Sequence, residues 1–155
     1  MLIAQGNIAS TYSALERFEE ALSLKQEVYS GFLKRYGEEH EIALRAANNY
    51  ASSLIDSQRS EEAKALMRKT VPVARRVLGE NDIITLTMTC FYAQMLYDDP
   101  GATLGDLREA VTTLEKMEQI SHRVLGAGYP IALRIESCLK ESRAALHARI
   151  GPRGE

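Results

Sequence analysis

The stretch Tyr36-Gly-Glu-Glu-His-Glu-Ile-Ala-Leu44 returns in related form twice more along the chain. The later copies are Leu78-Gly-Glu-Asn-Asp-Ile-Ile-Thr-Leu86 and Leu125-Gly-Ala-Gly-Tyr-Pro-Ile-Ala-Leu133. Their glycines, at 37, 79 and 126, are separated by 42 and then by 47 residues. Self-similarity at a period of roughly 20–50 residues predicts a repeat array, in which each unit packs against its neighbours.

Small residues recur at the same spacing. They are Ala9, Ala51 and Ala93 in one column, and Ala21, Ala63 and Ala110 in another. The five extra residues of the third repeat fall between Leu96 and Glu109, in a stretch rich in Asp, Gly and Thr that is typical of a loop. An insertion confined to a loop leaves the helices on both sides in register, as expected of a solenoid.

Each repeat is predicted to form two helices, because apolar residues recur at helical spacing through both halves. The recurring glycine is expected to end the second helix in a left-handed conformation. Seven helices are predicted, over 2–15, 18–36, 41–57, 60–78, 83–98, 105–125 and 130–149. The fold class is therefore all-α, an α-α superhelix (solenoid) of about three helix pairs and a C-terminal capping helix.

One domain is expected over residues 1–150. Its repeats span 2–40, 41–82 and 83–129, with the cap helix at 130–149 and a disordered tail at 151–155.

The two ends of the array differ. In the last helix Lys140 occupies the small-alanine column and Arg143 an apolar column, so this helix is predicted to cap the array with a polar face. Leu2 already occupies the first column of a repeat, and no cap precedes it. Two explanations stay open: the chain is cut from a longer array, or copies associate end to end through the uncapped first helix, with Ile3 covered by another copy.

Composition restricts the function classes. The net charge of −2 gives no basic surface for nucleic acid, and no apolar run reaches the length of a membrane span, so neither partner is expected. No signal peptide is seen at the N-terminus. The two cysteines do not form a Cys-x-x-Cys motif, which favours a reducing, cytoplasmic setting.

No group of residues predicts catalysis, a metal site or a cofactor. The histidines at 40, 122 and 147 lack metal-ligand spacing, and His40 is expected to cap a helix. By the repeat alignment, Cys90 and Cys138 fall on adjacent helices and come near one another, where free, packed thiols are favoured over a disulfide. The chain is therefore not expected to be an enzyme.

Three motifs carry a family resemblance. Arg45-Ala-Ala-Asn-Asn-Tyr-Ala-Ser-Ser-Leu54 is similar to the Leu-Asn-Asn-Leu-Ala-x-Leu-Tyr core of tetratricopeptide repeats of the kinesin light chain type, which also have a period of about 42 residues. Arg59-Ser-Glu-Glu-Ala63 resembles the Gly-Lys-Tyr-x-Glu-Ala turn of that family. Val77-Leu-Gly-Glu-Asn-Asp-Ile-Ile-Thr-Leu86 resembles its Val-Leu-Gly-x-x-His-Pro-x-Thr-Leu joint. The resemblance covers residues 2–150, although the His-Pro pair itself does not appear intact.

The resemblance implies a peptide groove lined by the first helix of each repeat. The groove asparagine of the family corresponds to Asn7 and Asn49, with Phe91 in the third repeat. Residues one turn away share that helical face. The full implied site is Asn7, Ser10, Arg45, Asn49, Ser52, Thr87, Phe91, Gln94 and Arg134. Arg45 and Arg134 are expected to suit a carboxylate on the ligand, and Phe91 an apolar side chain.

Two functions are compatible with this architecture. The first is a protein–protein interaction module, an adaptor or scaffold that binds a peptide or a partner domain in a concave groove. The alternative is a structural or sensor segment of a larger signalling protein, such as a repeat-containing ATPase.

Overall fold

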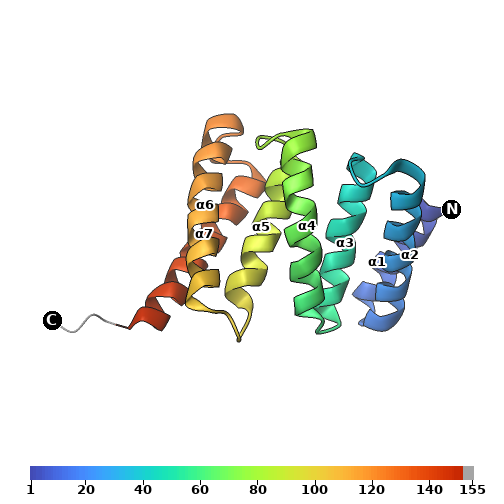
Figure 1. Cartoon of the computed structure of the whole chain (residues 1–155), viewed down its shortest axis with the longest axis horizontal. Coiled ribbons are helices and arrows are strands. Elements are labelled where there is room, and N and C mark those ends of the chain that lie inside the picture. Colours follow the sequence, from blue (N-terminus) through green and yellow to red (C-terminus); the bar gives the residue numbers. More distant parts are fainter. Residues whose placement is uncertain (152–155) are drawn as a thin grey trace. The chain divides into compact units, whose positions relative to one another are not determined.

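The computed structural model describes residues 1–151, and within them the chain forms seven helices and no strand (Figure 1). The helices are α1 (Leu2–Ala14), α2 (Phe18–Tyr36), α3 (Glu41–Asp56), α4 (Ser60–Leu78), α5 (Ile83–Asp98), α6 (Leu104–Val124) and α7 (Pro130–Ile150). Each predicted boundary lies within one residue of the observed one, and the all-α class is confirmed. The predicted tail begins at Gly151, which follows α7, and its remaining residues lie outside the described part.

The chain divides into two compact units. The first unit, Met1–Val77, contains α1 to α4, and the second, Leu78–Glu155, contains α5 to α7. In the first unit α2 packs against α1 and against α3. In the second unit α6 packs against α5 and α7, and α5 also contacts α7. The single domain expected over 1–150, with its three repeats, stays a prediction.

The recurring alanines all lie in the core. Every member of the two columns is 0% exposed, namely Ala9, Ala51, Ala93, Ala21, Ala63 and Ala110. Packing in protein interiors is dense, so a position this enclosed accepts a methyl group and little more. The repeat columns therefore mark fully enclosed positions in the core of each unit.

The joints between repeats are built from capping side chains and glycines. The backbone N–H of Ile42 donates to His40 Nδ1 at 3.2 Å, and that of Ile84 donates to Asp82 Oδ1 at 2.8 Å. The expected capping role of His40 is thus confirmed. Gly37 has φ 85° with ψ 168°, a conformation essentially restricted to glycine but more extended than the left-handed helical turn expected there.

The turns within the first unit repeat in detail. Glu16 and Gln58 both have φ 59°, in the left-handed region. Each is followed by an arginine that bonds the glutamate three residues later: Arg17 to Glu20 and Arg59 to Glu62, both at 2.6 Å. These ion pairs are exposed, so they contribute little to stability.

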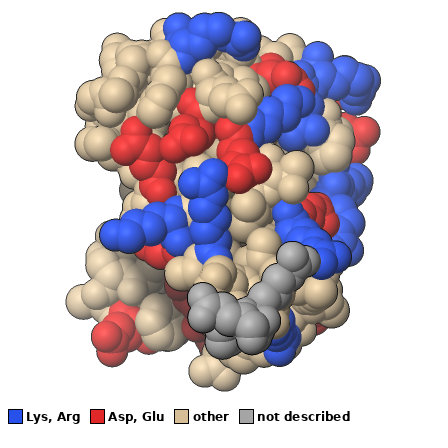
Figure 2. All heavy atoms as spheres, turned by 90° about the vertical axis from the view of Figure 1, so that its left-hand side faces the viewer, with Lys and Arg blue, Asp and Glu red and all other residues tan. Residues whose placement is uncertain are grey.

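The last helix carries the polar face predicted for a cap. Lys140 and Arg143 are exposed, and Arg143 Nη2 donates to Glu115 Oε1 of α6 at 2.8 Å. Figure 2 shows basic and acidic side chains interspersed on this side of the molecule. Within residues 1–151, no helix combines the length and the apolar character that crossing a membrane requires.

Candidate functional site

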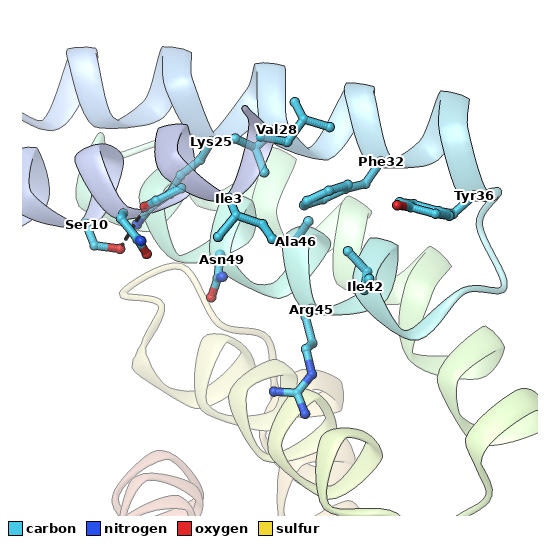
Figure 3. A pocket seen from close by; sticks show the side chains of 13 residues that line it. Ile3, Ser10, Lys25, Val28, Phe32, Tyr36, Ile42, Arg45, Ala46 and Asn49 are labelled. Atoms are coloured by element: carbon cyan, nitrogen blue, oxygen red, sulfur yellow. Dashed lines mark hydrogen bonds between the residues drawn. The ribbon is translucent and has the colours of Figure 1, made fainter.

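A pocket of about 600 Å³ lies between α1, α2 and α3 of the first unit (Figure 3). Its lining residues are Leu2, Ile3, Gly6, Asn7 and Ser10 of α1, Lys25, Val28, Phe32 and Tyr36 of α2, and Ile42, Arg45, Ala46 and Asn49 of α3. The volume lies within the range of pockets that hold a small molecule or a peptide side chain.

Four of the predicted site residues line this pocket. They are Asn7, Ser10, Arg45 and Asn49, whereas Ser52 is not part of the lining. Both asparagines are exposed, and within residues 1–151 neither side-chain amide forms a hydrogen bond. The hydroxyl of Ser10 donates to the Gly6 carbonyl of its own helix at 3.1 Å. Two side-chain amides at this pocket therefore have unused hydrogen-bonding capacity.

The apolar wall comes largely from α2, which the sequence analysis did not assign to the site. Lys25, Val28, Phe32 and Tyr36 follow one another at spacings of three and four residues, so they form a single stripe along the helix. The spacing of three and four residues is a sequence signal for this stripe, whereas the family resemblance implies a groove lined only by the first helix of each repeat. Opposite this stripe, Ile3 projects from α1 and is 74% exposed (Figure 3).

Two cations border the pocket, and its lining includes no carboxylate. Lys25 Nζ donates to Ser13 Oγ at 3.3 Å, and burial lowers the pKa of Lys25, partly offset by the Asp56 carboxylate. Arg45 Nε donates to Glu41 Oε1 at 3.0 Å in an exposed pair. In Figure 3 the Arg45 guanidinium extends away from the apolar wall, at the rim of the pocket. The pocket therefore has an apolar interior and a weakly basic border.

The remaining predicted residues lie in the second unit, on α5 and α7. The Thr87 hydroxyl donates to the Ile83 carbonyl within its own helix at 2.7 Å. Gln94 donates to Asp98 Oδ2 and accepts from Arg134 Nη2, each at 3.1 Å. Phe91 is partly exposed. Gln94 and Arg134 are thus directly hydrogen-bonded, so the Arg134 guanidinium already has a neutral partner on the protein.

Within residues 1–151, no group of three or more His, Cys, Asp or Glu side chains is arranged to hold a metal ion. His122 Nε2 lies 2.7 Å from Glu136 Oε1, and His40 is used in capping. Both side chains therefore have a structural partner on the protein.

The family model described as tetratricopeptide repeat matches residues 1–75. The first half of the chain therefore resembles tetratricopeptide repeats. No curated protein sequence matches this repeat chain. Solved structures extend the fold over both units. The first is the crystal structure of the nearly identical TPR-like repeats of a Podosopora anserina protein described as a kinesin light chain, with TM-score 0.82 and 22% identity. It aligns with 93% of the repeat chain, which in turn spans 66% of that structure.

Two further structures show the same fold. A crystal structure of a point variant of the Podosopora anserina repeats has TM-score 0.59 and 19% identity, and the match covers 96% of this chain and 88% of that one. BtubC (BKLC) from P. vanneervenii has TM-score 0.57 and 13% identity, and the match covers 99% of this chain and 66% of that one. Identities this low establish the fold alone. Together with the family match over residues 1–75, they confirm the predicted resemblance to tetratricopeptide repeats of the kinesin light chain type.

Proposed function

We propose that this repeat chain is an adaptor that binds a partner protein through an extended peptide segment seated in the pocket between α1, α2 and α3. Tetratricopeptide repeats generally mediate protein–protein interaction and typically lack catalytic activity. The observation that carries the proposal is the pairing of an open apolar wall with two unbonded amides, Asn7 and Asn49, at the same pocket.

Each chemical feature of the pocket suits a different part of such a peptide. An asparagine amide both donates and accepts, so it can hold a peptide backbone without selecting the side chains. The wall of Ile3, Val28 and Phe32 suits one apolar side chain of the ligand. Lys25 and Arg45 at the border favour a peptide that carries a carboxylate, in a side chain or at its C-terminus. Ser52 of α3 is a further proposed contact of this peptide. Within the second unit, Thr87, Phe91, Gln94 and Arg134 stay proposed contact residues for a protein ligand.

The proposal can be tested with a displayed library of random peptides, selected against the whole chain. Peptides recovered in this way should bind with micromolar affinity, about −8 kcal/mol, because a shallow pocket offers few contacts. Replacing Asn49 by alanine removes an amide that would pair with the peptide backbone, so the dissociation constant should rise about 3–10-fold. Isothermal titration calorimetry measures this change.

Asn81→Ala is the matched control, because Asn81 is an exposed asparagine in the loop before α5 and is not part of the pocket. It should leave the affinity unchanged. Circular dichroism should show the same helix content in both variants. Selected peptides that bind the Asn7→Ala/Asn49→Ala double variant as tightly as the parent would place the binding surface elsewhere.

We also propose that copies of the chain associate end to end through the face of α1 that carries Ile3. Met1 is 98% exposed, Ile3 74% and Ile8 47%, which is a large apolar area for one short helix. Sedimentation velocity over a range of concentrations should reveal a weak association that Ile3→Glu abolishes. Association of equal strength in that variant would exclude this face.

A further inference from the structure

Two thiols meet in the second unit, where α5 contacts α7. Cys90 Sγ and Cys138 Sγ are 3.7 Å apart, with the Cys90 thiol donating to the Cys138 sulfur. Both thiols are free, and their residues are only 0% and 5% exposed. Because 48 positions separate the two cysteines in the sequence, helix packing rather than a local turn brings them together.

The surroundings distinguish the two sulfur atoms. On α7, exposed Arg134 lies one turn before Cys138 and exposed Glu141 nearly one turn after it, so Cys138 lies directly beneath polar surface side chains. The Tyr97 hydroxyl donates to Glu141 Oε2 at 2.9 Å. Cys90, with no exposed surface, lies behind this layer.

The hydrogen bond between the thiols also shifts their two pKa values in opposite directions. Accepting the S–H of Cys90 lowers the pKa of Cys138 to about 6, and the Arg134 charge acts in the same direction, while burial and the Glu141 carboxylate oppose the shift. The same bond, together with burial, raises the pKa of Cys90. One sulfur of the pair is therefore suited to be the thiolate and the other to remain the thiol. A thiolate is the form that reacts with oxidants.

We propose that Cys90 and Cys138 form an oxidisable dithiol, which a hydroperoxide converts into a disulfide joining α5 to α7. Two buried thiols that merely fill space would be inert toward such an oxidant. The distance between them, their unequal environments and the position of Cys138 between two exposed polar residues of α7 together favour the reactive alternative.

The reaction balances with hydrogen peroxide as the only added reactant. The Cys138 thiolate attacks one peroxide oxygen, so an S–O bond forms, the O–O bond breaks, and hydroxide leaves and takes up a proton as water. The Cys90 sulfur then attacks the sulfenic acid of Cys138. The S–S bond forms, the S–O bond breaks, and the departing hydroxide takes the Cys90 proton as the second water. Each sulfur loses one electron, and the peroxide gains two.

The two sulfur atoms must still come closer together before a disulfide can form. A disulfide needs its sulfur atoms about 2.05 Å apart, so side-chain rotation and a small shift between the two helices must bring them closer than 3.7 Å. The product would fasten α5 to α7, the two helices that carry the bonded pair Gln94 and Arg134. The proposal does not depend on any peptide being bound.

The experiment uses the whole chain, fully reduced and then exposed to a few equivalents of hydrogen peroxide at neutral pH under native conditions. Remaining thiols are blocked with N-ethylmaleimide in denaturant, and the intact mass is measured. The expected product has lost about 2 Da, carries no maleimide, and regains both thiols on treatment with dithiothreitol. Peptide mapping should find the bond between Cys90 and Cys138.

Two controls make the result specific. In Cys90→Ser the resolving thiol is missing, so Cys138 should accumulate a sulfenic acid that dimedone captures. In concentrated urea the parent chain should cross-link at least about tenfold more slowly, because unfolding separates the sulfurs and removes the environment of Cys138.

Three results would overturn the proposal. One is full maleimide labelling of both thiols after peroxide treatment of the native chain. Another is oxidation of Cys138 to a sulfinic acid without a disulfide. The third is an equal cross-linking rate in urea, since the fold would then contribute nothing. All three results are measured on the parent chain, so they remain decisive even if a serine variant folds poorly.

Discussion

The side chain of Ala51 is fully enclosed, like the equivalent alanines 42 residues before and after it. Ala51→Leu forces three additional carbon atoms into a packed interior, which should lower the free energy of unfolding by about 1–3 kcal/mol. Urea unfolding followed by circular dichroism measures the loss. Ala65→Leu makes the same change at an exposed position of α4 and should have little effect. Equal effects at both positions would show that the Ala51 column is not tightly packed.

The paired thiols predict how stability depends on pH. The pKa of Cys138 in the folded chain is about 6, below the ordinary value of 9.0, so folding favours its thiolate. The contribution of this lowered pKa to the free energy of unfolding is fully present above pH 9 and is lost as the pH falls through 6. Cys90, whose pKa is raised, acts in the opposite sense: its contribution is present below pH 9 and is lost at higher pH. The combined contribution of the two thiols to the free energy of unfolding should therefore be greatest near pH 9.

Urea unfolding of the reduced chain at several pH values tests this dependence. The difference in unfolding free energy between the parent and Cys138→Ser should grow from pH 6 to pH 9, because the variant lacks the titrating thiol. A difference that stays constant across this range would contradict the assignment of Cys138 as the thiolate.

Among the elements, the turns between paired helices contain the clearest departure from local preference. Gln58, between α3 and α4, has φ 59°, which is unfavourable for a residue with a side chain and easily adopted by glycine. Gln58→Gly should therefore raise the free energy of unfolding by about 0.5–1 kcal/mol. Gln26→Gly, at an exposed position within α2, should lower it by about 1 kcal/mol. Thermal and urea unfolding measure both changes, and a destabilising Gln58→Gly would mean that the side chain makes a needed contact.

Helix positions could be predicted closely because the period fixes where each helix starts and ends. A glycine or a capping residue recurs at each joint, so an error in one repeat is corrected by the others. The pocket could be predicted only in part, since Asn7 and Asn49 follow from the repeat columns but Phe32 and Tyr36 belong to α2. Side-chain partners on different helices could not be predicted from the repeat: the period does not indicate that Arg134 of α7 bonds Gln94 of α5.

For the whole molecule, the two proposed interactions of the first unit compete. Ile3 belongs both to the exposed face of α1 and to the pocket wall, so one residue cannot serve both contacts at once. A saturating peptide ligand should therefore shift self-associated chain toward monomer, and dilution should strengthen apparent peptide binding. Sedimentation velocity with and without a selected peptide measures this shift. Unchanged association at saturation would show that the two surfaces are separate.

The five additional residues between α5 and α6 have a practical consequence. The loop is held at both sides, by Asp99 Oδ1 accepting from the Gly101 backbone and by Thr103 and Asp106 capping α6, while Pro100 and Gly101 are exposed. Added length at an exposed loop tip costs little, because closing a longer loop is only weakly penalised. An epitope or a fluorescent reporter spliced between Pro100 and Gly101 should leave α5 and α6 intact, so the protein can be followed in cells with both termini free.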